Sequence, residues 1–370
     1  MTGSRHSANL LCGISNCNNK KVIQMKKLKL TIIAFLITIL TISIIAYSNE
    51  KSGFDLANIL HEDDIPTNGF RILEMHIFEI EHAGLGLIKI IPTISRDDRT
   101  VFFFADEDGV IVWKTDDFQS NTWLMGRVKQ ENIDLLTIAF RDLTGNGLDD
   151  IVLITTCRNT ESSYAGKIYN VADVLFQNAD GYYRDHRISD KLNRFDMNKN
   201  YPSIIAFVRD GISMEFLFTA KTMDELRDNG FRPNTSRSAT EIFEFFGVVD
   251  VIPGHFQMAG SNYLMVYLVD QSGRILWNFQ PMHDYVNFYA TKHISVVDIN
   301  GDGYKDLVLL AWYVAYDENR TVIVKQDYNI YYQQAGYFWE DTEIKKYYPC
   351  TDEDNMSDII FRARKYWGWD

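Results

Sequence analysis

The strongest constraint on the fold is that this 370-residue chain repeats itself. Three blocks recur in the same order: VFFFADEDGVIVW (101–113) with MVYLVDQSGRILW (265–277), IAFRDLTGNGLDDIVLI (138–154) with SVVDINGDGYKDLVLL (295–310), and DVLFQNADGYY (173–183) with NIYYQQAGYF (329–338). IIP at 90–92 also matches VIP at 251–253. Ordered matches at similar spacing indicate a duplication. We therefore expect two halves of one architecture.

Each block has the pattern of a β-hairpin. The strand runs are rich in β-branched and aromatic residues, and Gly or Asp-Gly turns separate them. DEDG at 106–109 and DQSG at 270–273 predict ordinary hairpin turns. Between the halves, 202–220 predicts one more hairpin and 222–231 a short helix. Many short, locally paired strands predict an all-β fold.

The N-terminal region has the features of a membrane-targeting segment. Residues 30–49 hold no charge and follow Lys26, Lys27 and Lys29. About twenty apolar residues can cross the hydrocarbon layer as a helix, and lysines on the near side keep that end in the cytoplasm. The same pattern fits a secretory signal cleaved after Ser48. We expect one transmembrane or signal helix, with the body on the cell membrane's outer side, or secreted if cleaved.

These observations predict the following organisation along the chain. Residues 1–25 are a short cytoplasmic tail or precede the natural start, 26–49 are the anchor or signal, 50–69 a linker, 70–200 the first β half, 201–240 a connecting hairpin and short helix, 241–348 the second β half, and 349–370 a C-terminal tail. The tail is expected to be a last strand or a loose basic end.

Charge narrows the choice of partners. The net charge is −13, yet residues 1–48 contain six Lys or Arg and no acid, so the rest of the chain is more acidic still. Such a body repels phosphate backbones, which argues against nucleic-acid binding. Divalent cations suit it better.

One acidic turn has the spacing of a calcium loop. DINGDGYKD at 298–306 places Asp298, Asn300, Asp302 and Asp306 at positions 1, 3, 5 and 9, with Gly303 at 6 and the Tyr304 carbonyl at 7. Ca²⁺ takes six to eight oxygen ligands, and a loop supplies them from alternate positions around a glycine. A metal-free Asp/Asn/Gly turn is the alternative. Four oxygen-bearing side chains exceed what a turn needs.

The duplicate of this turn is DLTGNGLDD at 142–150. Asp142, Thr144, Asn146 and Asp150 occupy the same four positions. Thr144 and Asn146 are neutral, weaker ligands, and ligand charge tunes affinity. We expect a weaker site here, or a relic whose turn persists without the ion.

The pattern of a strand, D-x-[DNT]-x-[DN]-G-x-x-D and an apolar strand resembles the FG-GAP/VCBS-type repeat. That repeat occurs in integrin α-subunit propellers and in many bacterial surface proteins. The resemblance covers 295–310 and 138–154 directly. It implies a β-propeller whose loops join the first two strands of a blade and hold Ca²⁺. The implied ligands are Asp298, Asn300, Asp302, Tyr304 (carbonyl) and Asp306, and more weakly Asp142, Thr144, Asn146, Leu148 (carbonyl) and Asp150.

The spacing of the two loops departs from the family. They begin 156 residues apart, at 142 and 298, whereas family blades recur at shorter intervals. Intermediate blades would therefore lack the loop. Blocks 86–115, 135–187, 202–220, 247–280 and 292–345 predict a propeller of about five blades. Two tandem β-domains would explain the duplication equally simply.

Sequence motifs give little support for catalysis. The chain contains no HExxH, no G-x-S-x-G and no P-loop. Trp113 and Trp277 recur at matching strand ends, which indicates core packing. Cys157 and Cys350 are either a disulfide or two buried thiols. We expect an extracytoplasmic, calcium-stabilised module that binds an unknown protein or glycan. The alternatives are a polysaccharide lyase or hydrolase on the same scaffold, and a purely structural domain.

Overall fold

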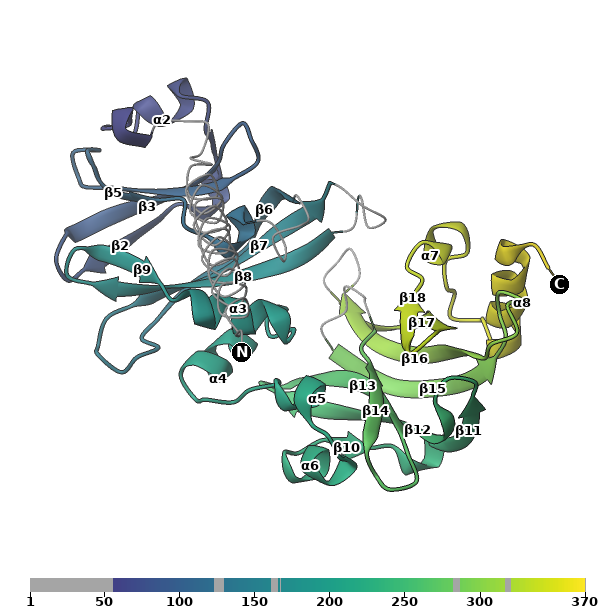
Figure 1. Ribbon diagram of the computed structural model, residues 1–370. Helices are drawn as coiled ribbons and strands as arrows, with labels where there is room; N and C mark the ends of the chain where they lie inside the picture. Colours follow the sequence, from purple (N-terminus) through teal and green to yellow (C-terminus); the bar gives the residue numbers. More distant parts are fainter. Residues whose placement is uncertain are drawn as a thin grey trace, which may run out of the picture. The chain divides into compact units, whose positions relative to one another are not determined.

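The computed structural model describes residues 56–122, 130–160, 166, 168–281, 287–316 and 321–369 (Figure 1). It divides the chain into two compact units, Met1–Asn58 and Ile59–Asp370. The described part of the first unit is the 3₁₀ helix η1 (Leu56–Asn58). No helix in these described ranges is long and apolar enough to span a membrane. The expected anchor or signal at 26–49 lies outside them.

The second unit contains four antiparallel sheets in its described residues (Figure 1). Sheet I comprises β1 (Arg71–Ile72), β2 (Phe78–His82), β3 (Gly86–Ile94), β4 (Thr100–Ala105) and β5 (Ile111–Thr115). Sheet II comprises β6 (Gln130–Arg141), β7 (Asp150–Asn159), β8 (Ile168–Asn178) and β9 (Gly181–Arg184). Sheet III comprises β10 (Arg232–Pro233), β11 (Ala239–Phe243), β12 (Gly247–Met258), β13 (Ser261–Val269) and β14 (Ile275–Phe279). Sheet IV comprises β15 (Asn287–Val297), β16 (Asp306–Tyr316), β17 (Val322–Gln334) and β18 (Tyr337–Glu340).

Helices and short 3₁₀ turns connect and flank these sheets. They are α2 (Asp64–Thr67), η2 (Glu74–His76), η3 (Gln119–Asn121), α3 (His186–Arg194), α4 (Tyr201–Val208), α5 (Phe216–Thr219), α6 (Met223–Asp228), η4 (Thr235–Arg237), α7 (Ile344–Tyr347) and α8 (Met356–Trp367).

The element order repeats, as the duplication predicts. Sheets I and III share one strand order, and sheets II and IV are both meanders of four strands. The irregularities recur as well. The pairing of β6 with β7 shifts register at Asn132/Asp134 and Leu135/Thr137, and that of β15 with β16 shifts at Phe288/Ala290 and Thr291/His293. Because a bulge is a specific backbone feature, its recurrence confirms that the halves share one architecture.

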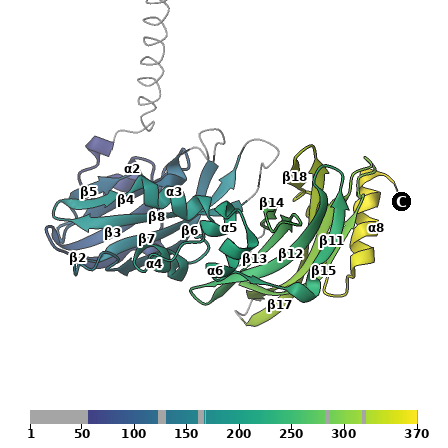
Figure 2. The ribbon, with the colours of Figure 1, turned by 60° about the horizontal axis from the view of Figure 1, so that its bottom comes forward.

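Alternating burial explains how the sheets pack. On β7, Ile151 and Leu153 belong to the core cluster shared with sheet I, whereas Val152 and Ile154 belong to the cluster shared with helices α3–α6 and sheet III. Successive side chains of a strand point to opposite faces, so β7 is buried on both. On β16, Leu307 and Leu309 face sheet III, whereas the alternate residues face α8. Figure 2 shows α8 in yellow at the edge of this half. The apolar runs DIVLIT and DLVLL are thus central, doubly covered strands.

The expected hairpin at 202–220 is wrong, because this segment forms α4 and α5. The Asn200 side chain accepts a hydrogen bond from the backbone N–H of Ser203 and caps α4. Ile204 and Leu217 then fill the core between sheets II and III. A short apolar run that is buried on most sides has no clear period, so helix and strand cannot be told apart. The segment adds no fifth sheet.

The C-terminal tail is also different from the expectation. It forms α8, which begins with a capping box between Asn355 and Asp358 and ends at Gly368 with φ +84°. It is neither a strand nor a loose end. The predicted helix at 222–231 is confirmed by α6. Gly109 and Gly273 adopt φ +78° and +85° in the two predicted hairpin turns.

Two smaller expectations concern tryptophan and cysteine. Trp113 packs against Phe104 with ring centroids 4.7 Å apart, and Trp277 lies 6.0 Å from Phe338, so both belong to the core regions. Cys157 is buried and Cys350 is half-buried, and both are free thiols. Burial raises the pKa of the Cys350 thiol to about 11.

A buried ion pair closes the outer edge of sheet II. Arg184 lies 3.2 Å from Asp173, and both side chains are almost fully buried. The backbone N–H of Gln119 donates to both Asp173 oxygens at 3.0 and 2.9 Å, and the Ser189 hydroxyl donates at 3.0 Å. At the equivalent positions of sheet IV, Asn329 donates to Glu340 at 2.6 Å. The two halves thus carry different polar pairs at equivalent positions of their last two strands.

We predict that Arg184→Met destabilises the protein, because it leaves the buried Asp173 carboxylate without its cation. The expected cost is about 3–5 kcal/mol in free energy of unfolding. Adding Asp173→Asn removes the unpaired charge and should restore most of that loss. Urea unfolding of both variants measures this. A single variant as stable as the native chain would contradict the assignment.

Candidate calcium loops

The two candidate loops occupy equivalent places in the fold. The first connects β6 to β7, and the second connects β15 to β16. In both, the ninth residue, Asp150 or Asp306, is also the first residue of the following strand. Both ninth residues are fully buried, while residues 144–147 and 301–304 in the middle of the loops are exposed. The ten residues predicted from the sequence lie in two separate loops, five in each.

The first aspartate of each loop organises the turn. Asp298 accepts hydrogen bonds from the backbone N–H groups of Gly301 and Gly303 at 2.8 and 3.0 Å. Asp142 accepts from Gly145 and Gly147 at 2.7 and 2.8 Å. All four glycines have positive φ, between +76° and +86°, which the turn requires and a side chain would oppose. The Gly147 hydrogen bond is the main reason that the pKa of Asp142 is lowered.

The middle positions bond to one another in the second loop. The Asn300 amide donates to Asp302 at 3.0 Å, and the Asp302 backbone N–H donates back to Asn300 at 3.2 Å. The Tyr304 N–H donates to Asp302 at 2.9 Å. In the first loop, the Leu148 N–H donates to Asn146 at 2.8 Å. Asp302 and Asn146 are exposed, and Asn300 is half-buried.

The last aspartate of each loop faces inward. Asp306 accepts from the backbone N–H groups of Ile299 and Gln333 at 2.8 and 2.9 Å. Burial raises the pKa of Asp306 to about 7, and the nearby Asp302 and Asp298 charges add to the rise. Burial likewise raises the pKa of Asp150, which accepts from Leu143 and Gln177 at 3.0 and 2.9 Å.

In each half, a glutamine on the third strand of the four-stranded meander links the candidate loop to the neighbouring sheet, which is sheet I or sheet III. The Gln333 amide donates to the Lys305 carbonyl at 3.1 Å, and its oxygen accepts from the Phe245 N–H at 3.1 Å. In the first half, the Gln177 amide donates to the Asp149 carbonyl at 2.9 Å, and its oxygen accepts from the Ala83 N–H at 3.1 Å.

We did not identify these glutamines from the sequence. The third repeated block carries the signal, because Gln177 and Gln333 align in DVLFQNADGYY and NIYYQQAGYF.

The second loop is also held by the C-terminus. Arg364 donates two hydrogen bonds to the Asp298 carbonyl, at 3.3 and 3.0 Å. The Trp369 indole N–H donates to the Ile299 carbonyl at 2.7 Å. The Arg364 guanidinium also lies 4.8 Å from the centre of the Trp369 ring. Helix α8 and the residues after it are therefore anchored on this loop.

The donor set suits Ca²⁺ by type, because hard carboxylate, amide and carbonyl oxygens are what that ion binds. The geometry is that of a hydrogen-bonded turn. Within the ranges that the structure describes, no group of three or more His, Cys, Asp or Glu side chains is arranged to hold a metal. Each oxygen of Asp306 accepts one backbone hydrogen bond and keeps a second lone pair.

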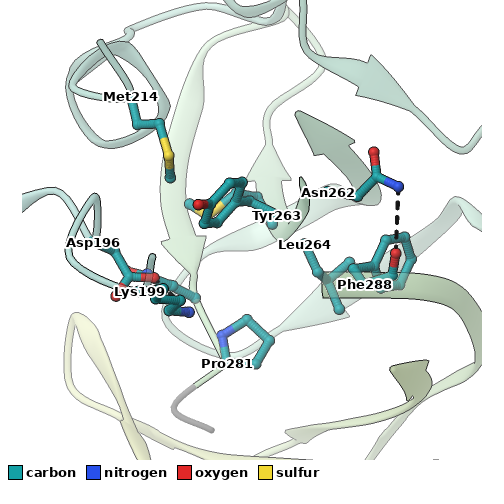
Figure 3. Close-up of a pocket in the computed structure, with 10 residues that line it drawn as sticks. Asp196, Lys199, Met214, Asn262, Tyr263, Leu264, Pro281 and Phe288 are labelled. Carbon is teal, nitrogen blue, oxygen red and sulfur yellow. Dashed lines mark hydrogen bonds and ion pairs between the residues drawn. The ribbon is translucent and has the colours of Figure 1, made fainter. Parts of the chain in front are cut away.

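A small pocket lies elsewhere in the second unit (Figure 3). Asp196 and Lys199 form an ion pair of 2.6 Å in it, and Lys199 lies 5.9 Å from the centre of the Tyr263 ring. Asn262 donates to the Phe288 carbonyl at 3.5 Å. The pocket has room for about one water molecule. Its two charged side chains neutralise each other.

We predict that Asp306 makes stability depend on pH when calcium is absent. Between pH 3.8 and about 7 the folded chain holds a proton that the unfolded chain has released. The free energy of unfolding therefore falls as pH rises through this window and levels off above it. Asp306→Asn should flatten that part of the profile. Urea unfolding in chelator at several pH values measures it, with the exposed Asp108→Asn as control. Parallel profiles for native and Asp306→Asn chains would disprove the assignment.

Comparisons with known proteins add no family to this picture. No protein-family model matches the chain, and no curated protein sequence is significantly similar to it.

Proposed function

We propose that this protein is an extracytoplasmic, calcium-binding module of the β-propeller type that binds a protein or glycan at the cell surface. The segment at 30–49 supports the location, since its length and flanking lysines suit an anchor or an export signal. Calcium is the proposed ion at both loops, with the stronger site at 298–306. We propose no catalytic activity.

The second loop carries this proposal. Three carboxylates, Asp298, Asp302 and Asp306, lie close enough that the first two raise the pKa of the third. A bound cation would offset the repulsion between these three carboxylates. Asp298, Asn300, Asp302 and the Tyr304 carbonyl would hold it from the exposed side. Asp306 would hold it from the strand end.

The architecture supports the propeller part of the proposal. Sheets II and IV are four-stranded meanders, which is the topology of a propeller blade. Sheet I packs face to face on sheet II, and sheet III on sheet IV. Both candidate loops connect the first two strands of such a meander. In the FG-GAP/VCBS-type repeat, which these loops resemble, the metal loop also joins the first two strands of a blade.

We predict that calcium stabilises the protein through the second loop. With calcium about 100-fold above its dissociation constant, binding contributes about 2.7 kcal/mol, which corresponds to a rise in Tm on the order of 5 °C. Asp302→Ala should remove most of this response. Thermal melting of the full-length chain in mild detergent, with calcium or with EGTA, measures it.

The matched control is Asp108→Ala, an exposed acid in the ordinary β4–β5 turn. It should keep the native response to calcium. Asn146→Ala reports on the weaker first loop and should change the response less than Asp302→Ala. If EGTA leaves the Tm of the native chain unchanged, the calcium proposal fails.

A further inference from the structure

A row of aromatic side chains lies at the surface between β18, α7 and α8. Trp339, Trp367 and Tyr347 are exposed by 37, 43 and 67%. Neighbouring rings connect them: Trp339 stacks on Tyr332 at 5.4 Å, and Tyr332 lies 5.4 Å from Trp367. We call Trp339, Trp367, Tyr366 and Tyr347 the aromatic row. Large apolar side chains grouped at a surface usually mark a binding site.

Hydrogen bonds and ring contacts fix the row in place. The Trp367 indole N–H donates to the Tyr332 hydroxyl at 2.7 Å, and that hydroxyl donates to the buried Asp341 at 3.3 Å. Tyr366 then bridges to Trp367 at 5.8 Å and to Tyr347 at 5.7 Å. Rings that are already ordered lose little conformational entropy when a ligand binds. The row is therefore a preorganised surface.

Comparison of the two halves shows which aromatic side chains of the row belong to the shared fold and which occur only in the second half. The first half has Phe176 and Tyr183 where the second has Tyr332 and Trp339, and these two rings also contact each other, at 5.5 Å. One ring pair at this place thus belongs to the shared architecture. The remainder of the row comes from α7 and α8, which follow the second half. Packing of the repeat does not require these added exposed rings.

Both lysines of α7, which precede Tyr347 of the row, form ion pairs. On α7, Lys345 lies 2.8 Å from Asp327, and Lys346 lies 2.8 Å from Glu343. Groups satisfied in this way attract a charged partner weakly. A neutral ligand with an apolar face is the better electrostatic match.

We propose that the aromatic row binds neutral glycans. A sugar ring presents an apolar C–H face, which a flat aromatic face can cover, and a rim of hydroxyls, which exposed polar groups can meet. Trp339, Trp367 and Tyr347 provide three exposed rings linked by ring contacts, so an oligosaccharide fits better than a single sugar. This inference narrows the proposed function from protein or glycan to neutral glycan, and rests on it for the setting outside the cell.

The row is also connected to the second candidate loop. Helix α8 carries Trp367, and its Arg364 and the following Trp369 bond to the Asp298 and Ile299 carbonyls. Whatever orders the loop therefore helps to hold α8. Calcium should strengthen glycan binding only through this support, while the ring faces make the contact.

Affinity gel electrophoresis of the full-length chain in mild detergent and calcium tests the proposal. The probes are the neutral polysaccharides dextran, mannan and laminarin, and the anionic polygalacturonate. We expect retardation by at least one neutral probe and none by polygalacturonate. Trp339→Ala and Tyr347→Ala should each weaken the retardation constant about tenfold or more. The control is Phe361→Ala, an aromatic residue of α8 that is 56% exposed but lies outside the row.

Several results would overturn the proposal. They are no retardation by any neutral probe, equal retardation of native and Tyr347→Ala chains, or row-dependent binding to phosphatidylcholine vesicles in place of glycan. Row-dependent self-association without glycan binding would also overturn it. Tyr347 is the most exposed ring, so its variant tests the surface even if Trp339→Ala fails to fold. If a neutral probe retards the chain but EGTA does not change its Tm, the calcium proposal alone fails. Failure of the glycan proposal and failure of the calcium proposal are therefore distinguishable.

Discussion

The structure depends on a buried carboxylate at the start of β7 and of β16. Asp150 and Asp306 each accept one backbone hydrogen bond from their own loop and one from the third strand of the same sheet. Buried polar groups are tolerated when their hydrogen bonds are satisfied. One side chain thus closes the loop and sets where β7 or β16 begins. The neighbouring glutamine, Gln177 or Gln333, extends the connection to a hairpin turn of the adjacent sheet.

The same carboxylate connects stability to the proposed ion. Burial already disfavours the charged form of Asp306, and the adjacent acids disfavour it further. Either a proton on Asp306 or a bound cation beside it would offset the repulsion between these carboxylates. A proton and the proposed cation would therefore compete for the loop. Where calcium is plentiful, the ion would hold the loop without protonation. The loop also supports α8 through Arg364 and Trp369, which extends its influence to the aromatic row.

Much of the fold could be predicted from the sequence because the repeated blocks carry strong patterns. Alternating and continuous apolar runs place the hairpins, and glycine positions place the turns. The segment at 202–220 was harder, because its apolar residues lie in the core between two sheets and show no clear period. The helix α8 was missed although Asn355 and Asp358 form a helix start signal.

The candidate site was predictable in its residues but not in its connections. Spacing identifies the loop, since ligands and turn residues lie close in sequence. It says nothing of Gln333, which is 27 residues beyond Asp306, or of Arg364. The aromatic row has the same limitation, because its rings come from β18, α7 and α8 and meet only after these elements pack together.

The polar pairs Asp173–Arg184 and Asn329–Glu340 have a consequence for folding. Similar repeats within one chain can exchange strands and misassemble. Asp173 pairs with Arg184, whereas Asn329 pairs with Glu340. If β8 paired with β18, Asp173 would be buried against Glu340, and two carboxylates would repel. If β17 paired with β9, Arg184 would face a neutral amide. The divergence of this polar pair therefore disfavours the exchange of last strands between the two halves.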